Sequence, residues 1–488
     1  MAVIILKGQK AGIMKRDNLP LEITEKSKSK ISMALSIITL LLLSLILTQV
    51  DKAFVTADKK AASNKAREEQ QKEAEDSQET TTSSVNILAA GNNIFDDNIL
   101  LSGQADAAAW NYDQLYSLIR DQIGQADLSI VSQESVLTTD HNLTSAGPVY
   151  STPAEAGTAL VNAGFDIIAS ATDHVDDFGS EYMNHMLEFW RSSCPDTTVL
   201  GVHNSQEDAD SIRVIEKNQI KIAFLNYTFG SSTGSAKNEQ PFLVDYLERE
   251  KVTNAITQAK SISDCIIFLA HWGTLDNAVP NEYQNQWAQF LLQQGVTVLI
   301  GTHPQVLQPY HMLSDANGNE MLVYYSLGNL VSGAQSSPQL LGGLAKFTLE
   351  KTTSGETSTV KVTASALDPI VMHYSENMNI CNVYPLAAYT DTLAQSHGVL
   401  ALDYYSTMEV SSLQNLFNYI MNLPVTPSGG LNLLDYSFNP DTTLSGPDGS
   451  ILYPGEIEAA NSSDGSLGTL LQVMSGEISV SSQNLQTE

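Results

Sequence analysis

Two short segments in the second half of the chain contain the residues best suited to chemistry. His271–Gly273 reads His-Trp-Gly, Gly301–Gln305 reads Gly-Thr-His-Pro-Gln, and each follows an apolar run that predicts a buried strand. α/β enzymes assemble metal sites from histidines at the carboxyl ends of strands, because the loops there converge on one crevice. The two segments therefore indicate a metal-dependent hydrolase.

Further polar residues follow other expected strands in the same way. Asn92 comes after one apolar run, Glu134 after the next, and Asp173 and His174 after a third. One polar residue at a strand end is ordinary. A succession of such loops that mixes imidazole with carboxylate is typical of a divalent ion held by nitrogen and oxygen. The sequence thus predicts one pocket formed by separate loop tips.

The segments that must position these loops alternate between two patterns. Short apolar runs predict strands at Val85–Ala90, Leu128–Ser132, Ile167–Ser170, Val199–Val202, Ile222–Tyr227, Cys265–Ala270, Val296–Ile300 and Leu322–Ser326. Helical spacing of apolar residues predicts helices at Tyr112–Ile123, Ala154–Ala163, Glu181–Trp190, Val244–Ala259 and Tyr283–Gln294. This alternation predicts an α/β fold with βα units around a mostly parallel sheet. Leu344–Leu349 and Thr359–Leu367 are expected to close it as an antiparallel hairpin.

The net charge limits the kinds of partner. The 488 residues contain 25 Lys and Arg against 55 Asp and Glu, which gives a net charge of -30. A field of this sign opposes non-specific binding to nucleic acid and to anionic lipid headgroups, so no nucleic-acid partner is expected. The length allows one large or two ordinary domains with a sizeable core.

An uncharged apolar stretch near the start of the chain predicts a membrane anchor. Residues 31–50 contain no charge, and twenty residues at about 1.5 Å rise span a hydrocarbon core of roughly 30 Å. Lys26, Lys28 and Lys30 precede the stretch. They favour a basic cytoplasmic tail over residues 1–30 and a single-pass cell-membrane protein whose main domain is extracellular. A signal peptide cleaved near Val55–Ala57 is the alternative, and the length of the apolar stretch favours the anchor.

Composition divides the rest of the chain into three parts. Residues 51–84 have few large apolar side chains and are expected to form a solvated stalk, partly helical at Ala61–Ala74. Residues 85–400 carry the strand and helix patterns. Residues 401–488 are an acidic extension in which Leu413–Leu423 predicts one amphipathic helix, and the chain after residue 424 is expected to be mostly loop or disordered.

From about Val85 to about Tyr374 the sequence resembles the bacterial capsule-synthesis CapA family. That family is associated with poly-γ-glutamate capsules and is related in fold to calcineurin-like metallophosphoesterases. The resemblance rests on the order and spacing of several motifs, which are Gly164–His174 with Asp177–Gly179, His271–Gly273, Ile300–Pro304 and Tyr325–Asn329. It implies a four-layer αββα sandwich of the metallophosphoesterase type.

The chain departs from the family's pattern at several positions. The family usually has Asp at the position of Asn92, Asn at that of Asp173 and His at that of Gln305. Ser132 and Leu275 stand where Asn and Glu are common. The charge lost at position 92 is restored at position 173, whereas a neutral amide oxygen at position 305 does not favour zinc-like ions. The resemblance therefore implies at most one divalent ion (Mn, Zn or Mg), bound by Glu134, Asp173, His271 and His303.

His174 is the expected general acid, because an imidazole titrates near neutral pH and can donate a proton to a leaving group. Asp177, or alternatively Asp176, is expected to orient its ring. Additional lining of the site is expected from Asn92, Gln305 and Asn329. Asn92 is equally suited to a turn after Gly91, and Asn329 to tying down a loop.

Two functional hypotheses follow from the resemblance. In the first, the protein is a membrane-anchored enzyme whose metal-assisted hydrolase or transferase site acts in the synthesis, export or attachment of an anionic capsule polymer. A bound cation would then offset the repulsion between that polymer and the acidic domain. In the second, the fold is kept and the chemistry is lost. The domain is then a scaffold or polymer-binding partner of other capsule-synthesis membrane proteins.

Overall fold

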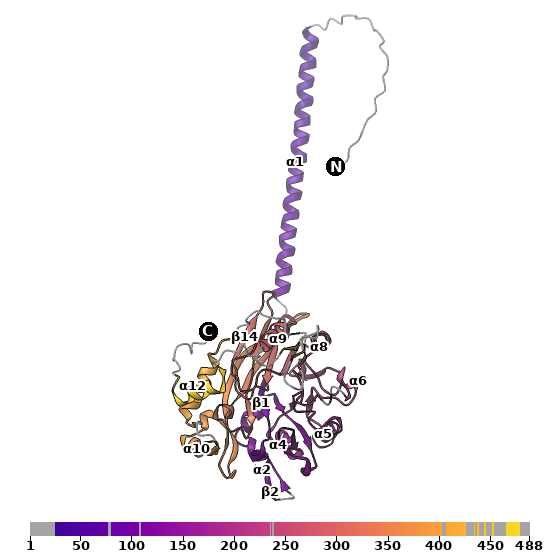
Figure 1. The fold of residues 1–488 in the computed structure, drawn as a ribbon. Coiled ribbons are helices and arrows are strands. Elements are labelled where there is room, and N and C mark those ends of the chain that lie inside the picture. The colour runs from indigo at the N-terminus through magenta and orange to yellow at the C-terminus, as the bar shows by residue number, and fades with distance from the viewer. Residues whose placement is uncertain are drawn as a thin grey trace. The chain divides into compact units, whose positions relative to one another are not determined.

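The computed structural model describes residues 25–76, 80–106, 109–234, 236, 239–402, 407–425, 434, 437–438, 444–445, 451–452 and 465–478. The chain divides into two compact units, Met1–Glu79 and Thr80–Glu488. Figure 1 shows the helices and strands of both units as a ribbon.

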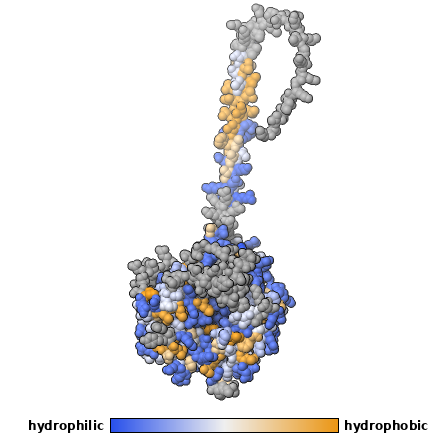
Figure 2. Space-filling view, viewed as in Figure 1, coloured by the Kyte–Doolittle hydropathy of each residue, from blue (hydrophilic) through white to orange (hydrophobic). Residues whose placement is uncertain are grey.

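The first unit contains one long helix, α1 (Glu25–Asp76). Its segment Ser32–Arg67 is long and apolar enough to cross a membrane. The apolar side chains of this segment are exposed, as the orange surface in Figure 2 shows. Its polar interruptions are satisfied locally, since Ser36 and Thr39 donate their hydroxyls to carbonyls one turn earlier. The expected span 31–50 lies within this helix, and the expected stalk is helical as far as Asp76.

The second unit is built around two mixed sheets. The first has the order β19-β18-β17-β1-β4-β8-β9, with β16 beside β1. Its strands are β1 (Thr80–Asn93), β4 (Leu128–Gln133), β8 (Ile167–Ala169), β9 (Thr198–Leu200), β16 (Asn329–Val331), β17 (Leu341–Ser354), β18 (Thr357–Tyr374) and β19 (Cys381–Pro385). β1 begins five residues before the expected boundary at 85, because Thr80–Ser84 continue the antiparallel pairing with β17.

The second sheet has the order β10-β11-β12-β13-β15-β14. Its strands are β10 (Arg213–Lys217), β11 (Ile220–Thr228), β12 (Cys265–His271), β13 (Val298–Thr302), β14 (Tyr310–Ser314) and β15 (Glu320–Tyr324). β11, β12, β13 and β15 pair in parallel, and β12 is buried along its whole length. Burial on both faces explains why this strand reads as a continuous apolar run.

Alternate residues of β12 divide the core into two layers. Cys265, Ile267 and Leu269 join the cluster shared with the first sheet, whereas Ile266, Phe268 and Ala270 join a second cluster. The second cluster also contains buried residues of α8 (Arg249–Ile262) and α9 (Glu282–Gln293), which cover the outer face of this sheet. α4 (Ala154–Ala163) and α5 (Ser180–Ser193) pack into the first cluster. The architecture is the expected four-layer αββα sandwich.

Two expected helices differ from the structure. The segment Tyr112–Ile123 is divided into a 3-10 turn, η1 (Asp113–Tyr116), and a short helix, α3 (Arg120–Gly124). The helix expected from Val244 begins only at Arg249. Its first residues are extended instead, because Val244 and Tyr246 form isolated β-bridges with Val202 and Thr228. In this segment, β-bridges to residues distant in sequence outweigh the local preference for a helix.

The C-terminal extension contains more regular structure than its composition indicates. α12 (Val410–Met421) corresponds to the expected helix, but α14 (Leu467–Ser475) falls in the stretch expected to be loop or disordered. Leu470, Val473 and Met474 of α14 are buried, and the helix packs against α12. A short apolar stretch within the polar tail thus provides a packing face. Most other residues after 425 lie outside the described part of the chain.

Candidate metal centre

Four of the expected site residues come from the ends of two pairs of parallel strands, one pair in each sheet. His271 ends β12, and His303 directly follows β13. Glu134 directly follows β4, and Asp173 lies in the loop after β8. β12 and β13 pair with His271 opposite Thr302, whose hydroxyl lies 3.0 Å from His271 Nδ1. Parallel pairing therefore sets the two histidine loops side by side.

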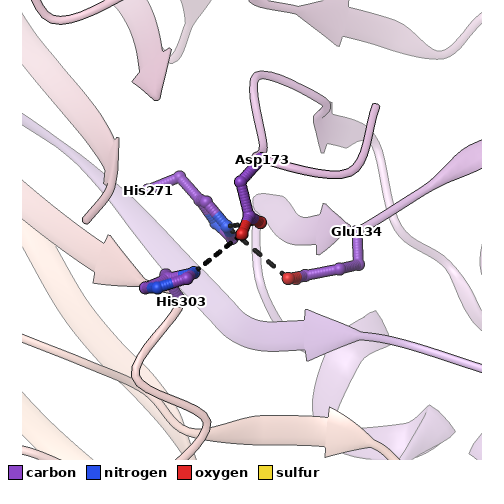
Figure 3. A group of neighbouring side chains, drawn as sticks. All are labelled: Glu134, Asp173, His271 and His303. Carbon is purple, nitrogen blue, oxygen red and sulfur yellow. Dashed lines mark hydrogen bonds and ion pairs between the residues drawn. The ribbon is translucent and has the colours of Figure 1, made fainter. Parts of the chain in front are cut away.

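These four side chains form one compact group, which we call the quartet (Figure 3). One ligand atom from each lies within 4.8 Å of all the others. His271 Nε2 is 2.8 Å from Asp173 Oδ1 and 3.5 Å from Glu134 Oε1, and His303 Nδ1 is 3.5 Å from Asp173 Oδ2. The structure thus brings together the four residues expected to bind a metal. Their role as ligands remains a prediction.

Two buried atoms of the quartet form no hydrogen bond with any of the described residues. They are Glu134 Oε2 and His303 Nδ1. A buried polar atom without a partner costs free energy and usually signals a strained, catalytic or ion-binding position. Two imidazole nitrogens and two carboxylates are also a donor set that borderline divalent ions accept. The residues present therefore fit one divalent cation.

The surroundings move the pKa values of Glu134, Asp173 and His271 in different directions. Burial, reinforced by the charge of Asp173, raises the pKa of Glu134 well above its usual value. Burial also acts to raise the pKa of Asp173, but the imidazoles of His303, His174 and His271 outweigh it and hold that pKa well below its usual range. Burial lowers the pKa of His271 to about 4. His271 is therefore neutral at physiological pH, the form in which imidazole binds metals.

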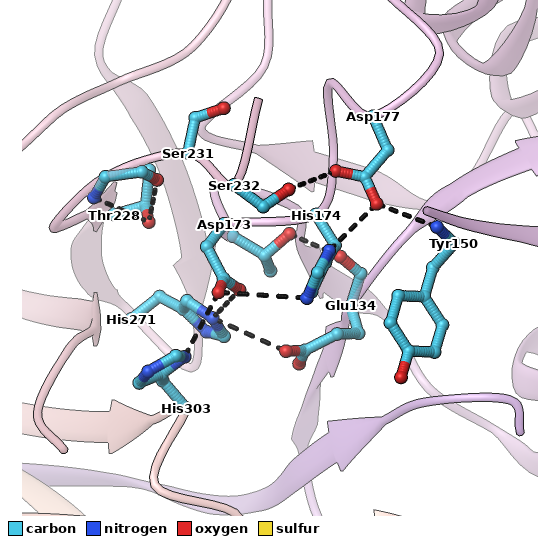
Figure 4. A network of polar contacts seen from close by, with 12 residues as sticks. Glu134, Tyr150, Asp173, His174, Asp177, Thr228, Ser231, Ser232, His271 and His303 are labelled. Carbon is cyan, nitrogen blue, oxygen red and sulfur yellow. Dashed lines mark hydrogen bonds and ion pairs between the residues drawn. The ribbon is translucent and has the colours of Figure 1, made fainter. Parts of the chain in front are cut away.

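His174 lies next to the quartet with its ring held by a carboxylate (Figure 4). Its Nδ1 is 2.8 Å from Asp177 Oδ2, which also accepts the backbone N–H of Tyr150 at 2.7 Å, and its Nε2 is 3.9 Å from Asp173 Oδ2. Burial opposes protonation, but Asp173 and Asp177 outweigh it and raise the pKa of His174 to about 9. Asp177 is thus the partner of His174 in the structure.

The other candidate for this role, Asp176, has different partners. Its carboxylate accepts hydrogen bonds from the Ser231 hydroxyl at 2.5 Å and the Ala236 N–H at 2.9 Å. Asp177 in turn accepts the hydroxyl of Ser232. The two adjacent aspartates therefore both tie down the segment that begins at Ser231, and only Asp177 also contacts the histidine.

Asn92 and Asn329, which were expected as lining residues, lie behind the quartet. Both are buried. Asn92 Oδ1 accepts the backbone N–H of His303 at 3.2 Å, and Asn92 Nδ2 donates to Asn329 Oδ1 at 3.4 Å. Asn329 donates to the carbonyl of Gln339 at 3.1 Å. Asn92 therefore supports the His303 loop directly, and Asn329 joins Asn92 to the segment of Gln339.

Gln305 is half-buried in a left-handed backbone conformation with φ 60°. Among the described residues, no hydrogen bond joins its side chain to the quartet. His303 is also left-handed, with φ 95°. Such a conformation is unfavourable for a non-glycine residue and persists only where its surroundings impose it. The loop that carries both residues is thus strained and closely held.

Two glycines allow the backbone to approach closely behind these loops. A Cβ atom at Gly91 would lie 1.9 Å from the carbonyl oxygen of Gly328, and one at Gly301 would lie 1.9 Å from that of Tyr325. Neither position tolerates a side chain without a shift of backbone. The Gly-Asn and Gly-Thr-His segments therefore owe their glycines to packing.

Three residues near the quartet escaped the sequence interpretation. The Phe229 ring lies 4.5 Å from that of His303, and the Tyr150 ring lies 4.6 Å from that of His174. The N–H of Asp276 donates to the carbonyl of Pro304 at 2.9 Å. Phe229 directly follows β11, so its place at a strand end was an available signal, whereas nothing in the sequence marks Tyr150 or Asp276.

Two curated capsule proteins are similar to this chain. The PGA biosynthesis protein CapA of Bacillus subtilis (strain 168) is 28% identical over 204 residues, which cover 41% of this chain and 51% of that protein. The capsule biosynthesis protein CapA of Bacillus anthracis is 25% identical over 178 residues, which cover 36% of this chain and 41% of that protein. The matches thus span about half the length of these relatives or less.

Solved structures resemble the chain more distantly. A 5'-nucleotidase precursor from Thermus thermophilus aligns with a TM-score of 0.35 and 13% identity, covering 59% of this chain and 54% of that one. A hypothetical protein from the same organism aligns with a TM-score of 0.33 and 12% identity, covering 58% of this chain and 98% of that one.

The assignment to a family comes from a family model. It describes the bacterial capsule synthesis protein PGA_cap and matches residues 86–334, which are about half of the chain and include the whole quartet. The chain belongs to this bacterial capsule synthesis protein family.

Proposed function

We propose that the quartet binds one divalent cation and that the protein handles an anionic capsule polymer at this site. The observation that carries the proposal is the convergence of two imidazoles and two carboxylates in a largely buried group, in which two polar atoms have no hydrogen-bond partner among the described residues. Two nitrogen ligands favour manganese or zinc over magnesium, which prefers oxygen. A bound cation of this kind would polarise a carbonyl or phosphoryl oxygen of the substrate.

The positions at which the chain departs from the family's usual residues support a single ion. Asn92, Ser132, Leu275 and Gln305 all lie outside the quartet. Asn92 holds the backbone of His303, and Leu275 is 48% exposed. Asp173, the one departure inside the quartet, adds a carboxylate to it. The substitutions therefore remove candidate ligands outside the quartet and leave the quartet as one complete set of four ligands.

The chain's own residues also suit proton transfer beside this ion. Asp177 orients the His174 ring through Nδ1, so the other ring nitrogen, Nε2, is on the side of Asp173. In this arrangement His174 would donate a proton to the leaving group of a substrate that contacts the ion. The reaction class that we propose is hydrolysis or group transfer on the polymer, for which the family indicates poly-γ-glutamate.

The proposed setting is the outer face of a cell membrane. The apolar segment of α1 is long enough to span a bilayer, and Lys26, Lys28 and Lys30 before it favour a cytoplasmic amino terminus. The second unit would then face outward, where capsule polymer and other capsule-synthesis membrane proteins are its proposed partners. A local cation would relieve the repulsion between a polyanion and this acidic chain.

The alternative is a scaffold or polymer-binding protein without catalysis. Gln305 favours it, because an amide stands where the family usually has a histidine, and its side chain has no hydrogen bond to the quartet among the described residues. In this case the second unit would keep the fold and bind polymer or partner proteins.

Metal content separates the two hypotheses. We expect the full chain, purified in detergent and exposed to manganese or zinc, to retain about one ion per chain by elemental analysis. His271→Ala should abolish retention, whereas the matched control His185→Ala, which changes an exposed histidine, should not. Retention of less than about a tenth of an ion by the unmodified chain would refute the metal centre.

A further inference from the structure

The C-terminal residues 465–478, which we call the clasp, form backbone contacts with the loop that follows His271. Ala278 donates its N–H to the carbonyl of Gly465 at 2.8 Å, and Asn277 forms an antiparallel β-bridge with Ser466. The clasp then continues as α14, which packs against α12 and has Leu470 among its buried residues. A segment near the end of the sequence is thus attached to a loop near the quartet.

That loop, residues 273–281, is attached in turn to the loop of His303. Asp276 donates its N–H to the carbonyl of Pro304 at 2.9 Å, and the Gln308 side chain donates to the carbonyl of Asn277 at 2.9 Å. The Asp276 carboxylate accepts a hydrogen bond from Gln339 at 2.7 Å. The contacts of the clasp and the contacts to the His303 loop fall on adjacent residues, so they share one short piece of backbone.

His303 depends on such support. Its φ of 95° is unfavourable for a side chain of its size and is maintained only if neighbouring groups impose it. The support comes from both sides of His303. Asn92 accepts a hydrogen bond from the N–H of His303, and the N–H of Asp276 donates one to the carbonyl of the next residue, Pro304. Loss of either contact would let the loop relax and move the imidazole away from the quartet.

We propose that the clasp is a positioning element of the metal centre, and that it fixes His303 through loop 273–281. Gly465 is its key positioning residue, because a Cβ atom there would lie 2.4 Å from both Asn277 Oδ1 and the backbone nitrogen of Val279. The part of this inference that concerns metal affinity rests on the proposed function. The part that concerns the His303 loop stands on the backbone contacts alone.

Two glycines of the clasp provide a matched pair of substitutions. Gly465→Ala introduces a methyl group into the contact with Asn277 and Val279, whereas Gly468→Ala, three residues later, introduces the same group into open space. Amide hydrogen exchange of the full chain in detergent is the first measurement. Gly465→Ala should accelerate exchange about tenfold in both loop 273–281 and residues 303–308, while Gly468→Ala leaves both unchanged.

The second measurement uses cobalt as a spectroscopic probe of the quartet. In Gly465→Ala we expect the visible absorption spectrum of the cobalt-loaded protein to change and the affinity for cobalt to fall about tenfold, as for other residues that support metal ligands. The Gly468→Ala protein should match the unmodified one. The midpoint of global unfolding should stay the same in both variants, which separates a positioning role from a general loss of stability.

Leu470→Ala provides a second route if Gly465→Ala does not fold. This change removes a buried side chain of α14, the helix that packs against α12, and it should accelerate exchange in the same two loops. Exchange that increases only within residues 465–478 would overturn the proposal. If the unmodified protein binds no cobalt, the proposed metal function fails, and the exchange of residues 303–308 still decides whether the clasp positions His303.

Discussion

The side chain of Asn92 accepts a hydrogen bond from the backbone N–H of His303, and the two residues lie 211 positions apart in the sequence. Asn92 pairs with Ser132 near the end of the parallel pairing of β1 with β4 on one sheet, and His303 follows β13 on the other. This bond therefore joins the two sheets at the edge where the quartet lies. It also gives a role to a position where the family usually has an aspartate.

Asn92→Ala should weaken metal binding although Asn92 is not in the quartet. The change leaves the N–H of His303 buried without its partner, which costs about 1–3 kcal/mol of folding free energy. Because the histidine loop loses one of its two supports, we expect metal affinity to fall about tenfold or more. Isothermal titration calorimetry measures the affinity. Asn86→Ala, at an exposed position of the same strand, is the control, and equal affinities in the two variants would contradict this role.

Glu134→Gln should separate stability from metal binding. Glu134 is 1% exposed, one of its oxygens has no hydrogen-bond partner among the described residues, and Asp173 lies nearby. A neutral amide of the same shape avoids the cost of a buried charge, so the metal-free variant should unfold at the same temperature or a higher one. Its metal affinity should fall at least about tenfold, because the amide is a weaker ligand.

Thermal unfolding with and without manganese tests this pair of effects. The exposed Glu181 supplies the control, since Glu181→Gln should change neither quantity. A metal-free Glu134→Gln protein that loses more than about 2 kcal/mol would show that the carboxylate stabilises the fold, contrary to the interpretation of the quartet as a binding site.

Acid should destabilise the second unit through a buried histidine pair distant in sequence from the quartet. The rings of His373 and His397 lie 4.9 Å apart, and burial lowers their pKa values to about 4 and about 3. In the unfolded chain a histidine titrates at about 6.5. The unfolded state therefore binds more protons below pH 6.5, and stability falls as the pH drops from about 6.5 towards 4.

We expect each of these histidines to contribute about 1–3 kcal/mol to that loss. Urea unfolding at a series of pH values measures the slope of the unfolding free energy against pH. His373→Phe should reduce this slope by the contribution of one histidine. The slope that remains then contains the contributions of His397 and of His271, whose pKa burial also lowers. His185→Phe, at an exposed position, should leave the slope unchanged, and an unchanged slope in His373→Phe would refute the assignment.

The sequence interpretation succeeded where one strand determines the position of a residue. The run Cys265–Ala270 is apolar on both faces and can only be a central strand, so His271 had to lie at a strand end. It was incomplete where two distant segments determine a position together. Asp276 matters through the carbonyl of Pro304, and α14 is stable because α12 offers it a partner. The segment from Val244 shows the same effect, since cross-strand bridges replaced its helical spacing.

The proposed topology is testable because the three natural cysteines, Cys194, Cys265 and Cys381, are all buried. An introduced cysteine should therefore dominate labelling by a membrane-impermeant maleimide on intact cells. Ser63→Cys, in the exposed part of α1 beyond the uncharged residues 31–50, should be labelled directly. Ser27→Cys lies among the lysines before that stretch and should be labelled only after the cells are permeabilised.

The mass of the purified chain separates the anchor from the cleaved signal peptide. An anchored protein keeps Ser27 and its lysine-rich neighbours, so both reporter cysteines remain on the chain. Cleavage near Val55–Ala57 would remove residue 27 and leave Ser63→Cys on a protein that no longer fractionates with membranes. Labelling of Ser27→Cys on intact cells would reverse the proposed orientation, because the positive charges would then lie outside. The quartet would in that case work on the cytoplasmic side, where it would meet the polymer before export.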